Sequence, residues 1–154
     1  ANLANADLRG SELRAWAHGA ATIDLTEADL ANADLSGAEL RAYAYGAATI
    51  DLTEADLANA DLSGAELRAY AYGKGDGDDS MIDLAGADFA NADLSDTKLF
   101  ANANYGDATI DLAGADLANA DLGGSMFTTD TLNSASTIDF TDANLTNADL
   151  NDSE

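Results

Sequence analysis

Residues 22–48 read TIDLTEADLANADLSGAELRAYAYGAA, and the chain repeats them at once, because residues 49–73 are identical to residues 22–46. The stretch divides into groups of five in which leucine recurs at every fifth position, with alanine two positions before most of these leucines. A period of five is neither the 3.6-residue period of a helix nor the simple alternation of a strand. It is typical of a chain that makes a short extended segment, turns a corner and repeats.

The spacing within each group of five predicts which side chains are buried. Side chains two positions apart on an extended segment share a face, so Leu and the preceding Ala point one way and the acidic residue between them points into water. Adding one repeat at a time aligns the leucines into columns, one of which contains Leu8, Leu35, Leu62, Leu94, Leu122 and Leu150. Repetition this strong predicts a solenoid, in which each coil buries its apolar edge against the next coil.

Ala-Asp-Leu and Ala-Glu-Leu groups recur through most of the chain, and they carry a resemblance to a known family. They stand at residues 28–30, 33–35, 38–40, 55–57, 60–62, 115–117 and 120–122. This pattern resembles the A-[DN]-L-x-x motif of the pentapeptide-repeat family. The resemblance implies an all-β chain folded as a right-handed parallel β-helix, here of about five to six coils. A coil of that family contains four groups of five, whereas this repeat is 27 to 28 residues long. We therefore expect a wider coil, to which YAYGA and AT are added.

We expect one β-solenoid domain over residues 1–154, with a loop insertion at 73–80 and an irregular coil at 123–136, where the pattern decays. The chain contains no cysteine, so we expect no disulfide, zinc ligand set or thiol nucleophile. No apolar run is long enough to span a membrane. The net charge of −23 argues against direct binding of nucleic acid and favours cations, a saline environment or a basic protein partner.

Two kinds of polar column are expected at the surface. The asparagines of the repeated ANADL segment align in one stack, and Asn tolerates the left-handed backbone of a tight corner. The aspartates align in further stacks, in which neighbouring coils lie about 4.8 Å apart and like charges repel. We expect each aspartate to cap its own turn, and the alternative is loose calcium binding along the stacks.

The insertion GKGDGDDSM resembles one nonapeptide of the RTX calcium-binding repeats. Gly75, Gly77, Asp79 and Met81 match that pattern, whereas Lys74 stands where its first glycine belongs. The resemblance implies a calcium site that contains Asp76, Asp78 and Asp79. Sites of that kind need successive nonapeptides and this chain has one, so the alternative is an acidic loop without an ion.

Aromatic residues form two neighbouring columns in the first three coils. One column contains Trp16, Tyr43 and Tyr70, and the other contains His18, Tyr45 and Tyr72. Continuation of the five-residue period favours aromatic side chains that point inward and fill the wider coil. Simple alternation with the intervening alanines would instead place them outside, as a patch suited to a partner or to lateral packing.

No catalytic motif is present, and the repeat alone explains the many carboxylate pairs, so we do not expect an enzyme. The chain starts and stops in good repeat, without a recognisable cap at either end. We therefore predict a self-assembling structural subunit that stacks head-to-tail into a filament, outside the cell or on its surface. The acidity would discourage side-by-side association. The expected end-to-end interface contains Ala1, Asn2, Leu3, Asn5, Leu8, Leu145, Asn147 and Leu150.

Two other functions remain open from the sequence. Some pentapeptide-repeat proteins resemble DNA in shape and charge and bind type II topoisomerases, so the resemblance implies an acidic, cytoplasmic DNA mimic as one alternative. The other is a halophilic or calcium-binding module, which the abundant aspartate and scarce lysine would suit.

Overall fold

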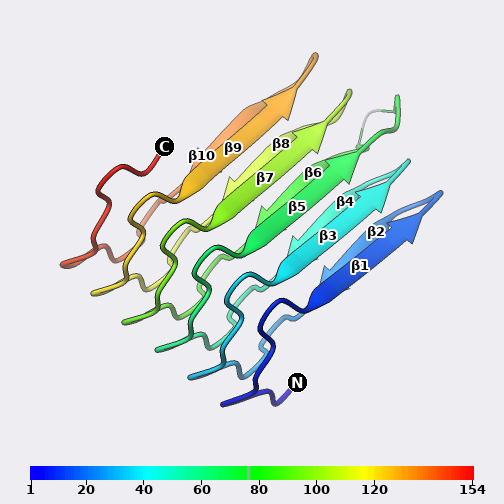
Figure 1. The fold of residues 1–154 in the computed structure, drawn as a ribbon. Coiled ribbons are helices and arrows are strands. Elements are labelled where there is room, and N and C mark those ends of the chain that lie inside the picture. Colours follow the sequence, from blue (N-terminus) through cyan, green and yellow to red (C-terminus); the bar gives the residue numbers. More distant parts are fainter. Residues whose placement is uncertain (76) are drawn as a thin grey trace.

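A computed structural model describes residues 1–75 and 77–154 as a parallel β-solenoid of about five turns (Figure 1). Ten strands form two five-stranded parallel sheets, and no helix lies within the described residues. The first sheet contains β1 (Glu12–Ala17), β3 (Glu39–Ala44), β5 (Glu66–Ala71), β7 (Lys98–Ala103) and β9 (Met126–Thr131). The second contains β2 (Ala21–Asp24), β4 (Ala48–Asp51), β6 (Ser80–Asp83), β8 (Ala108–Asp111) and β10 (Ser136–Asp139). The predicted all-β solenoid is thus confirmed.

The strand register gives the length of each coil. Glu12 lies opposite Glu39 and Glu39 opposite Glu66, so these coils advance by 27 residues. The next step, from Glu66 to Lys98, takes 32 residues because it contains the insertion, and the step from Lys98 to Met126 takes 28. The predicted wide coil is therefore confirmed. The two termini lie at opposite ends of the stack (Figure 1).

Three tight corners per coil connect the second sheet back to the first. In the coil of residues 22–48 they are at Glu27, Asn32 and Gly37, whose φ angles are 52°, 58° and 63°. The middle corner is asparagine in every coil, with φ between 57° and 59° at Asn5, Asn32, Asn59, Asn91, Asn119 and Asn147. This is the left-handed region in which Asn is tolerated better than most residues, and the expected corner role of the stack is confirmed.

The stacked aspartates cap the turns that follow them. In the stack Asp24, Asp51, Asp83, Asp111 and Asp139, each carboxylate accepts a hydrogen bond from the backbone N–H two residues later, at 2.7–3.1 Å. The stack Asp34, Asp61, Asp93, Asp121 and Asp149 makes the same bond at 2.9–3.1 Å. The predicted Asx-turn capping is confirmed, and it explains why the repeat needs an aspartate at these positions.

The core has two parts with different side chains. Between the corners its large side chains are Leu and Phe, among which Leu30, Leu57 and Phe89 are fully buried, whereas the isoleucines lie on the strands of the second sheet. Between the two sheets it is built largely of alanine, because Ala42 and Ala44 of β3 point inward toward β4. Such small side chains let Cα atoms of facing strands approach within 8 Å, closer than the typical sheet spacing of about 10 Å.

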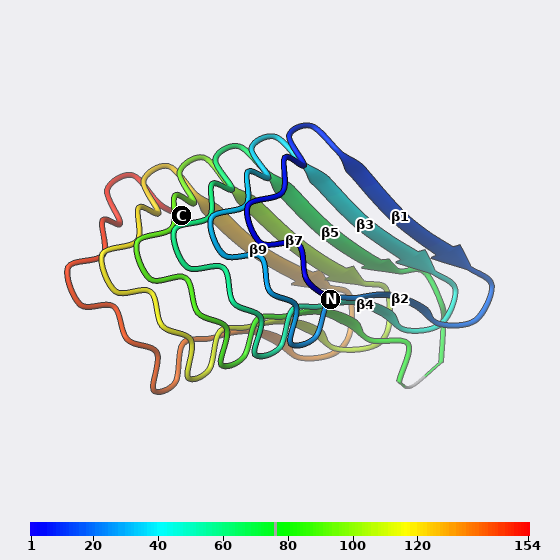
Figure 2. The same cartoon turned by 90° about the horizontal axis from the view of Figure 1, so that it is seen from below.

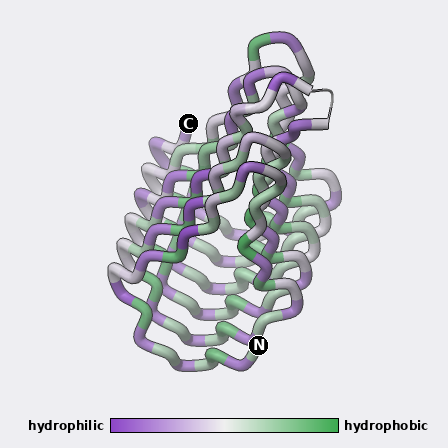
Figure 3. Tube along the Cα trace, turned by 90° about the vertical axis from the view of Figure 1, so that its right-hand side faces the viewer, coloured by the Kyte–Doolittle hydropathy of each residue, from purple (hydrophilic) through white to green (hydrophobic). Residues whose placement is uncertain are grey.

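The paired sheets therefore form a thin arm that projects to one side of the corner segments (Figure 2). This arm is what the added segments YAYGA and AT build, and it accounts for the long coil. Hydrophilic and hydrophobic positions alternate along every coil, and like positions stack between coils (Figure 3). β9 lies within the irregular segment 123–136 and pairs with β7 in register, so the sequence changes there while the ladder continues.

Candidate binding surfaces

The outer face of the first sheet is the most distinctive surface of the solenoid, and we call it the ladder face. It presents the first, third and fifth side chains of each long strand, because the second, fourth and sixth point into the arm. These residues are Glu12, Arg14 and Trp16 on β1, Glu39, Arg41 and Tyr43 on β3, Glu66, Arg68 and Tyr70 on β5, Lys98, Phe100 and Asn102 on β7, and Met126, Thr128 and Asp130 on β9.

The aromatic columns lie on this outer face and beyond its edge, so the inward interpretation favoured by the five-residue period is wrong. Trp16 is 63% exposed, Tyr45 55% and Tyr72 40%, while Tyr43 and Tyr70 are half-buried. The five-residue period ends at Leu40, where the chain enters a six-residue strand. Strand alternation then places Ala42 inside and Tyr43 outside.

The rings pack against one another across the coils. Tyr43 and Tyr70 stack with centroids 5.2 Å apart and an interplanar angle of 16°, and Tyr70 and Tyr72 stack at 6.0 Å and 8°. His18 stacks on Tyr45 at 5.7 Å and meets Trp16 edge-on at 5.0 Å. All six residues of the predicted aromatic ladder, namely Trp16, His18, Tyr43, Tyr45, Tyr70 and Tyr72, thus lie in one exposed cluster.

Desolvation within this cluster changes the acidity of two phenols. Burial by the neighbouring rings raises the pKa of both Tyr70 and Tyr72 above the ordinary value of 10.0, because the charged phenolate is poorly solvated there. The neighbouring guanidinium of Arg68 partly opposes this effect on the pKa of Tyr70. These hydroxyls therefore stay protonated, as hydrogen-bond donors, to a higher pH than a free tyrosine would.

Beside the rings, the arginines and glutamates form a continuous ion-pair ladder. Arg41 reaches Glu39 at 2.7 Å, Glu12 at 3.5 Å and Glu66 at 3.7 Å, so it links three coils. Arg68 pairs with Glu66 at 2.8 Å. The side chains of Arg41 and Glu66 are only 18% and 21% exposed, so solvent screens these pairs less than ordinary surface pairs, and the chain of pairs holds the side chains in a regular array.

The ladder face carries no net charge, which sets it apart from the rest of the molecule. Its four acidic residues, Glu12, Glu39, Glu66 and Asp130, balance its four basic residues, Arg14, Arg41, Arg68 and Lys98. The whole chain has only 6 basic residues against 29 acidic ones, so the net charge of −23 lies entirely outside this face.

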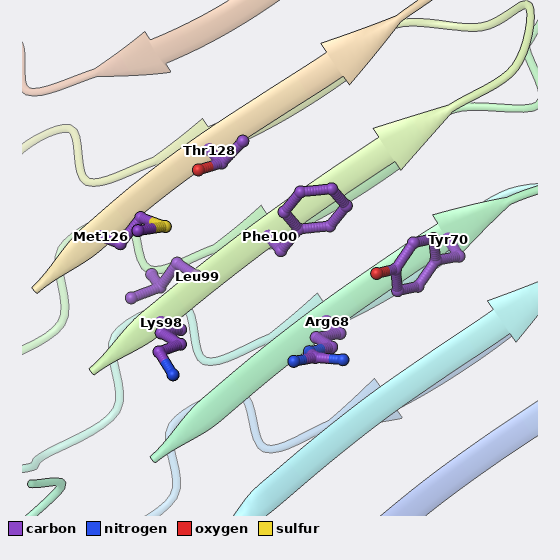
Figure 4. Close-up of a pocket in the computed structure, with 7 residues that line it drawn as sticks. All are labelled: Arg68, Tyr70, Lys98, Leu99, Phe100, Met126 and Thr128. Atoms are coloured by element: carbon purple, nitrogen blue, oxygen red, sulfur yellow. The ribbon is translucent and has the colours of Figure 1, made fainter. Parts of the chain in front are cut away.

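A shallow hollow of about 190 Å³ opens where the repeat changes on this face (Figure 4). In the row formed by Arg14, Arg41 and Arg68, the next position is Phe100 on β7 in place of an arginine. The following position, on β9, is the shorter Thr128. Tyr70 and Phe100 lie 5.3 Å apart at its wall. Its lining consists of Arg68, Tyr70, Lys98, Leu99, Phe100, Met126 and Thr128. No motif in the sequence marks this site, and its one sequence signal is the change from Glu66 and Arg68 to Lys98 and Phe100 one repeat later.

The two end coils expose apolar columns that interior coils bury. At the N-terminal end Leu3 and Leu8 are half-buried, whereas Leu30 in the next coil is completely buried. At the C-terminal end Leu145 and Leu150 are 38% and 45% exposed. The predicted interface residues Ala1, Asn2, Leu3, Asn5 and Leu8 thus lie on one end face, and Leu145, Asn147 and Leu150 lie on the other (Figure 1).

Comparison with known proteins agrees with this geometry. A family model described as "Pentapeptide repeats" matches residues 23–42 and 50–69, with eight copies of the repeat. The chain thus contains pentapeptide repeats, which the family model matches over 40 of its 154 residues. No curated protein matches the sequence of this pentapeptide-repeat protein.

Solved structures of other pentapeptide-repeat proteins are similar in fold alone. One is a pentapeptide-repeat protein from the Arabidopsis thaliana thylakoid lumen, with 23% identity, 99% of this chain and 67% of that chain covered, and a TM-score of 0.24. Another is QnrB1, a plasmid-mediated fluoroquinolone resistance protein, with 20% identity, 99% and 76% covered, and a TM-score of 0.33. A third is Rfr23 from the cyanobacterium Cyanothece 51142, with 20% identity, 99% and 86% covered, and a TM-score of 0.21.

The acidic insertion uses two of its carboxylates within the pentapeptide-repeat protein itself. Asp78 accepts a hydrogen bond from the N–H of Gly75 at 2.6 Å, and Asp79 accepts one from the N–H of Asp107 at 2.8 Å. Asp76, the third residue of the predicted calcium site, lies outside the described residues. Within residues 1–75 and 77–154, no three carboxylate or imidazole side chains are grouped as metal ligands would be. The calcium site stays a prediction.

The described part of this pentapeptide-repeat protein also contains no helix long and apolar enough to cross a membrane.

The exposed carboxylates at the two ends are well solvated. Hydrogen bonds from Arg9 lower the pKa of Asp7, and hydrogen bonds from Thr26 and Thr141 lower the pKa values of Asp24 and Asp139. The chemistry available at these surfaces is that of binding, through stacked rings, ion pairs and open coil edges.

Proposed function

We propose that this pentapeptide-repeat protein is a structural subunit that assembles head-to-tail, so that the coil at one end stacks on the coil at the other end of the next copy. The observation that carries the proposal is the match between the two end faces. Both expose strand edges and the same apolar columns, which every interior coil covers with its neighbour.

The end faces match column by column. Leu3 lies one coil before Leu30 in the column that ends at Leu145, so stacking places Leu3 of one copy over Leu145 of the other. In the same register Leu8 lies over Leu150. Covering two half-exposed leucines at each face would contribute about 2–4 kcal/mol in favour of association, at roughly 1 kcal/mol for each partly exposed side chain.

The same contact brings together the open backbone edges of the corner segments and leaves the edges of the arm unpaired. β1 pairs only with β3, and β9 pairs only with β7, so the outer edge of each is open. An open parallel edge is a template for another strand. With Leu3 over Leu145, the incoming β1 lies two coil steps above β9, because residues 143–153 already form one further level of corner segments. One strand position in each sheet of the arm therefore stays open at the junction.

Glu154 occupies the start of the strand position that stays open above β9. Glu154 donates its backbone N–H to Ser125 and accepts from Phe127, so it lies above β9 in the plane of the next coil. In the stack the incoming Glu12 lies one coil step above Glu154, so these two hydrogen bonds are kept.

Location outside the cell or on its surface is part of the proposal and rests on surface acidity alone. A strongly acidic rod with one neutral face suits an environment rich in salt, where screening within about 8 Å reduces repulsion between stacked carboxylates.

The proposal is tested with two variants that each block one end. Leu145→Glu/Leu150→Glu places charge on the C-terminal end face, and Leu3→Glu/Leu8→Glu does so on the N-terminal end face. Each variant alone is expected to form no filament. Mixed in equal amounts, the open C-terminal face of one meets the open N-terminal face of the other, so a discrete one-to-one complex is expected by light scattering.

The matched control replaces Thr109 by Glu, on the outer face of β8 in the middle of the solenoid. This variant adds one negative charge away from both ends, against two in each end-blocked variant, and should assemble as the unmodified chain does. Assembly that survives both end-blocked variants, or a mixture that forms no complex, contradicts head-to-tail stacking.

A DNA mimic that binds a type II topoisomerase is the second candidate, and the net charge of −23 is the observation that favours it. Its aspartate stacks repeat along the rod axis as a row of negative charge. Under this alternative the chain stays a discrete particle and inhibits supercoiling by DNA gyrase, with inhibition that weakens as salt rises. The end-blocked variants would then inhibit as well as the unmodified chain.

A further inference from the structure

We propose that the ladder face pairs with the ladder face of a second copy whose solenoid axis runs antiparallel. The two copies would be related by a twofold axis that is parallel to the strands and lies over β5. This lateral pairing is separate from end-to-end stacking, because it uses a different surface and needs neither end face.

Electrostatics restricts side-by-side contact to this face. Stacked carboxylates on the other surfaces would face stacked carboxylates of a second copy at distances within a Debye length, and like charges repel there. The ladder face is neutral, with four acidic and four basic side chains. The sequence-based expectation that acidity discourages lateral association thus holds for the acidic surfaces and does not apply to this one.

The order of charges along the axis selects the antiparallel arrangement. The N-terminal strands carry Glu12 and Glu39, whereas the corresponding positions on the C-terminal side are Lys98 and Met126. With the twofold axis over β5, β3 of one copy lies over β7 of the other, so Glu39 meets Lys98. Arg41 then meets Phe100, an arrangement suited to a cation–π contact.

The antiparallel pair faces like charges only at its axis, where Glu66 meets Glu66 and Arg68 meets Arg68, and the parallel arrangement brings more like charges together. A twofold axis along the solenoid would place every coil over its own counterpart, with the arginine row of one copy facing the arginine row of the other. Arg14 would lie over Arg14 and Arg41 over Arg41, and the glutamates would face the aromatic row. Like charges facing one another across an interface cost free energy.

The hollow on the ladder face also favours the antiparallel arrangement. It contains the cations of Arg68 and Lys98 beside Phe100, and its floor spans β5, β7 and β9 (Figure 4). In the antiparallel pair, Glu12 and Glu39 of the other copy lie over this cationic hollow. The exposed Trp16 lies toward β9 of the other copy, where Asp130 offers an acceptor for its indole N–H.

The size of the face predicts a weak pair that strengthens in an assembly. Five strands of six residues cover about 20 Å by 20 Å, or roughly 400 Å² in plan for each copy. That is at the low end for specific interfaces, so micromolar affinity is expected for two single copies. Where copies are already stacked end to end, every subunit adds a further contact and the apparent affinity rises steeply.

Lateral pairing is tested in the Leu145→Glu/Leu150→Glu variant, which leaves the ladder face unchanged and removes end-to-end stacking. Sedimentation equilibrium is expected to show a reversible dimer, and Lys98→Glu in the same background is expected to weaken it at least tenfold. A protein that remains monomeric at all concentrations up to the millimolar range overturns the proposal, while the end-to-end test is unaffected.

Cysteine cross-linking reports the orientation, because the chain contains no cysteine of its own. Tyr70→Cys lies at the twofold axis and should cross-link to itself with a short bismaleimide. Tyr43→Cys and Asn102→Cys should each link poorly alone and efficiently when mixed. Thr109→Cys, on the other sheet, is the control. Equal linking of Tyr43→Cys to itself, or of the control, contradicts the antiparallel pair.

Discussion

Tyr43 and Tyr70 stack on one another outside the solenoid, with ring centroids 5.2 Å apart, while Ala42 and Ala69 beside them in the sequence are completely buried. Each strand of the arm thus divides large and small side chains between its two faces. The small ones let the two sheets approach, and the large ones cover the outside with a neutral aromatic surface.

This division predicts opposite tolerance at neighbouring positions of β5. Ala69→Leu adds three carbon atoms between closely spaced sheets, so we expect a loss of about 1–3 kcal/mol in the free energy of unfolding. Tyr70→Leu, on the outer face, should cost less than about 1 kcal/mol because its ring is only half-buried. Urea denaturation of both variants measures the difference, and an equal or reversed order would contradict the inside–outside assignment.

The positive φ angles of the corner asparagines predict that the stability of the solenoid depends on how well the residue at each corner tolerates the left-handed conformation. Asn59 has a φ of 58° in an interior coil. Alanine is less favourable in this region, so Asn59→Ala should lower the free energy of unfolding by about 1–2 kcal/mol. Asn59→Gly, the matched control, removes the same side chain without the steric penalty and should cost clearly less. Thermal unfolding followed by circular dichroism distinguishes the two, and equal losses would indicate that the amide contacts dominate.

The phenols of Tyr70 and Tyr72 predict how stability responds to alkaline pH. Because their pKa values are raised in the folded protein, the stabilisation is fully present below the unfolded value of about 10. It is lost as the pH rises through the higher folded pKa values. Absorbance titration at alkaline pH should show tyrosines that ionise later than free tyrosine. Tyr70→Phe and Tyr72→Phe should each remove part of this late phase, and an unchanged titration curve in both variants would contradict burial as its cause.

The acidic surface predicts a general response to salt. Screening reduces repulsion between the aspartate stacks, so the melting temperature should rise with ionic strength. The described aspartates of the stacks accept backbone hydrogen bonds, and we expect calcium chloride and sodium chloride at matched ionic strength to act alike. An extra rise in calcium that chelation reverses, and that Asp78→Asn/Asp79→Asn abolishes, would instead support the calcium-binding alternative.

The solenoid could be predicted from the sequence because its determinants are local and repeated. The Leu and Ala spacing set the inward columns, Asn32 and its equivalents marked a corner, and the aspartates had an available N–H two residues on. The orientation of Tyr43 could not be predicted from the five-residue period, because Tyr43 lies on β3. Side chains on that strand alternate between the two faces with a period of two.

The charge balance of the ladder face also required the structure. Glu39 and Lys98 belong to different repeats, and only the strand register places them in the same row of one face. The same holds for the hollow, whose residues come from three strands that are distant in sequence.

Negative-stain electron microscopy of the purified 154-residue chain, combined with fibre diffraction over a range of concentrations, tests end-to-end assembly most directly. Head-to-tail stacking with Leu3 over Leu145 predicts uniform filaments, a 4.8 Å axial reflection, and a subunit repeat of about 29 Å from six coil levels of roughly 4.8 Å each. Short separate rods at every concentration, with or without calcium, would contradict it and place the DNA-mimic function first.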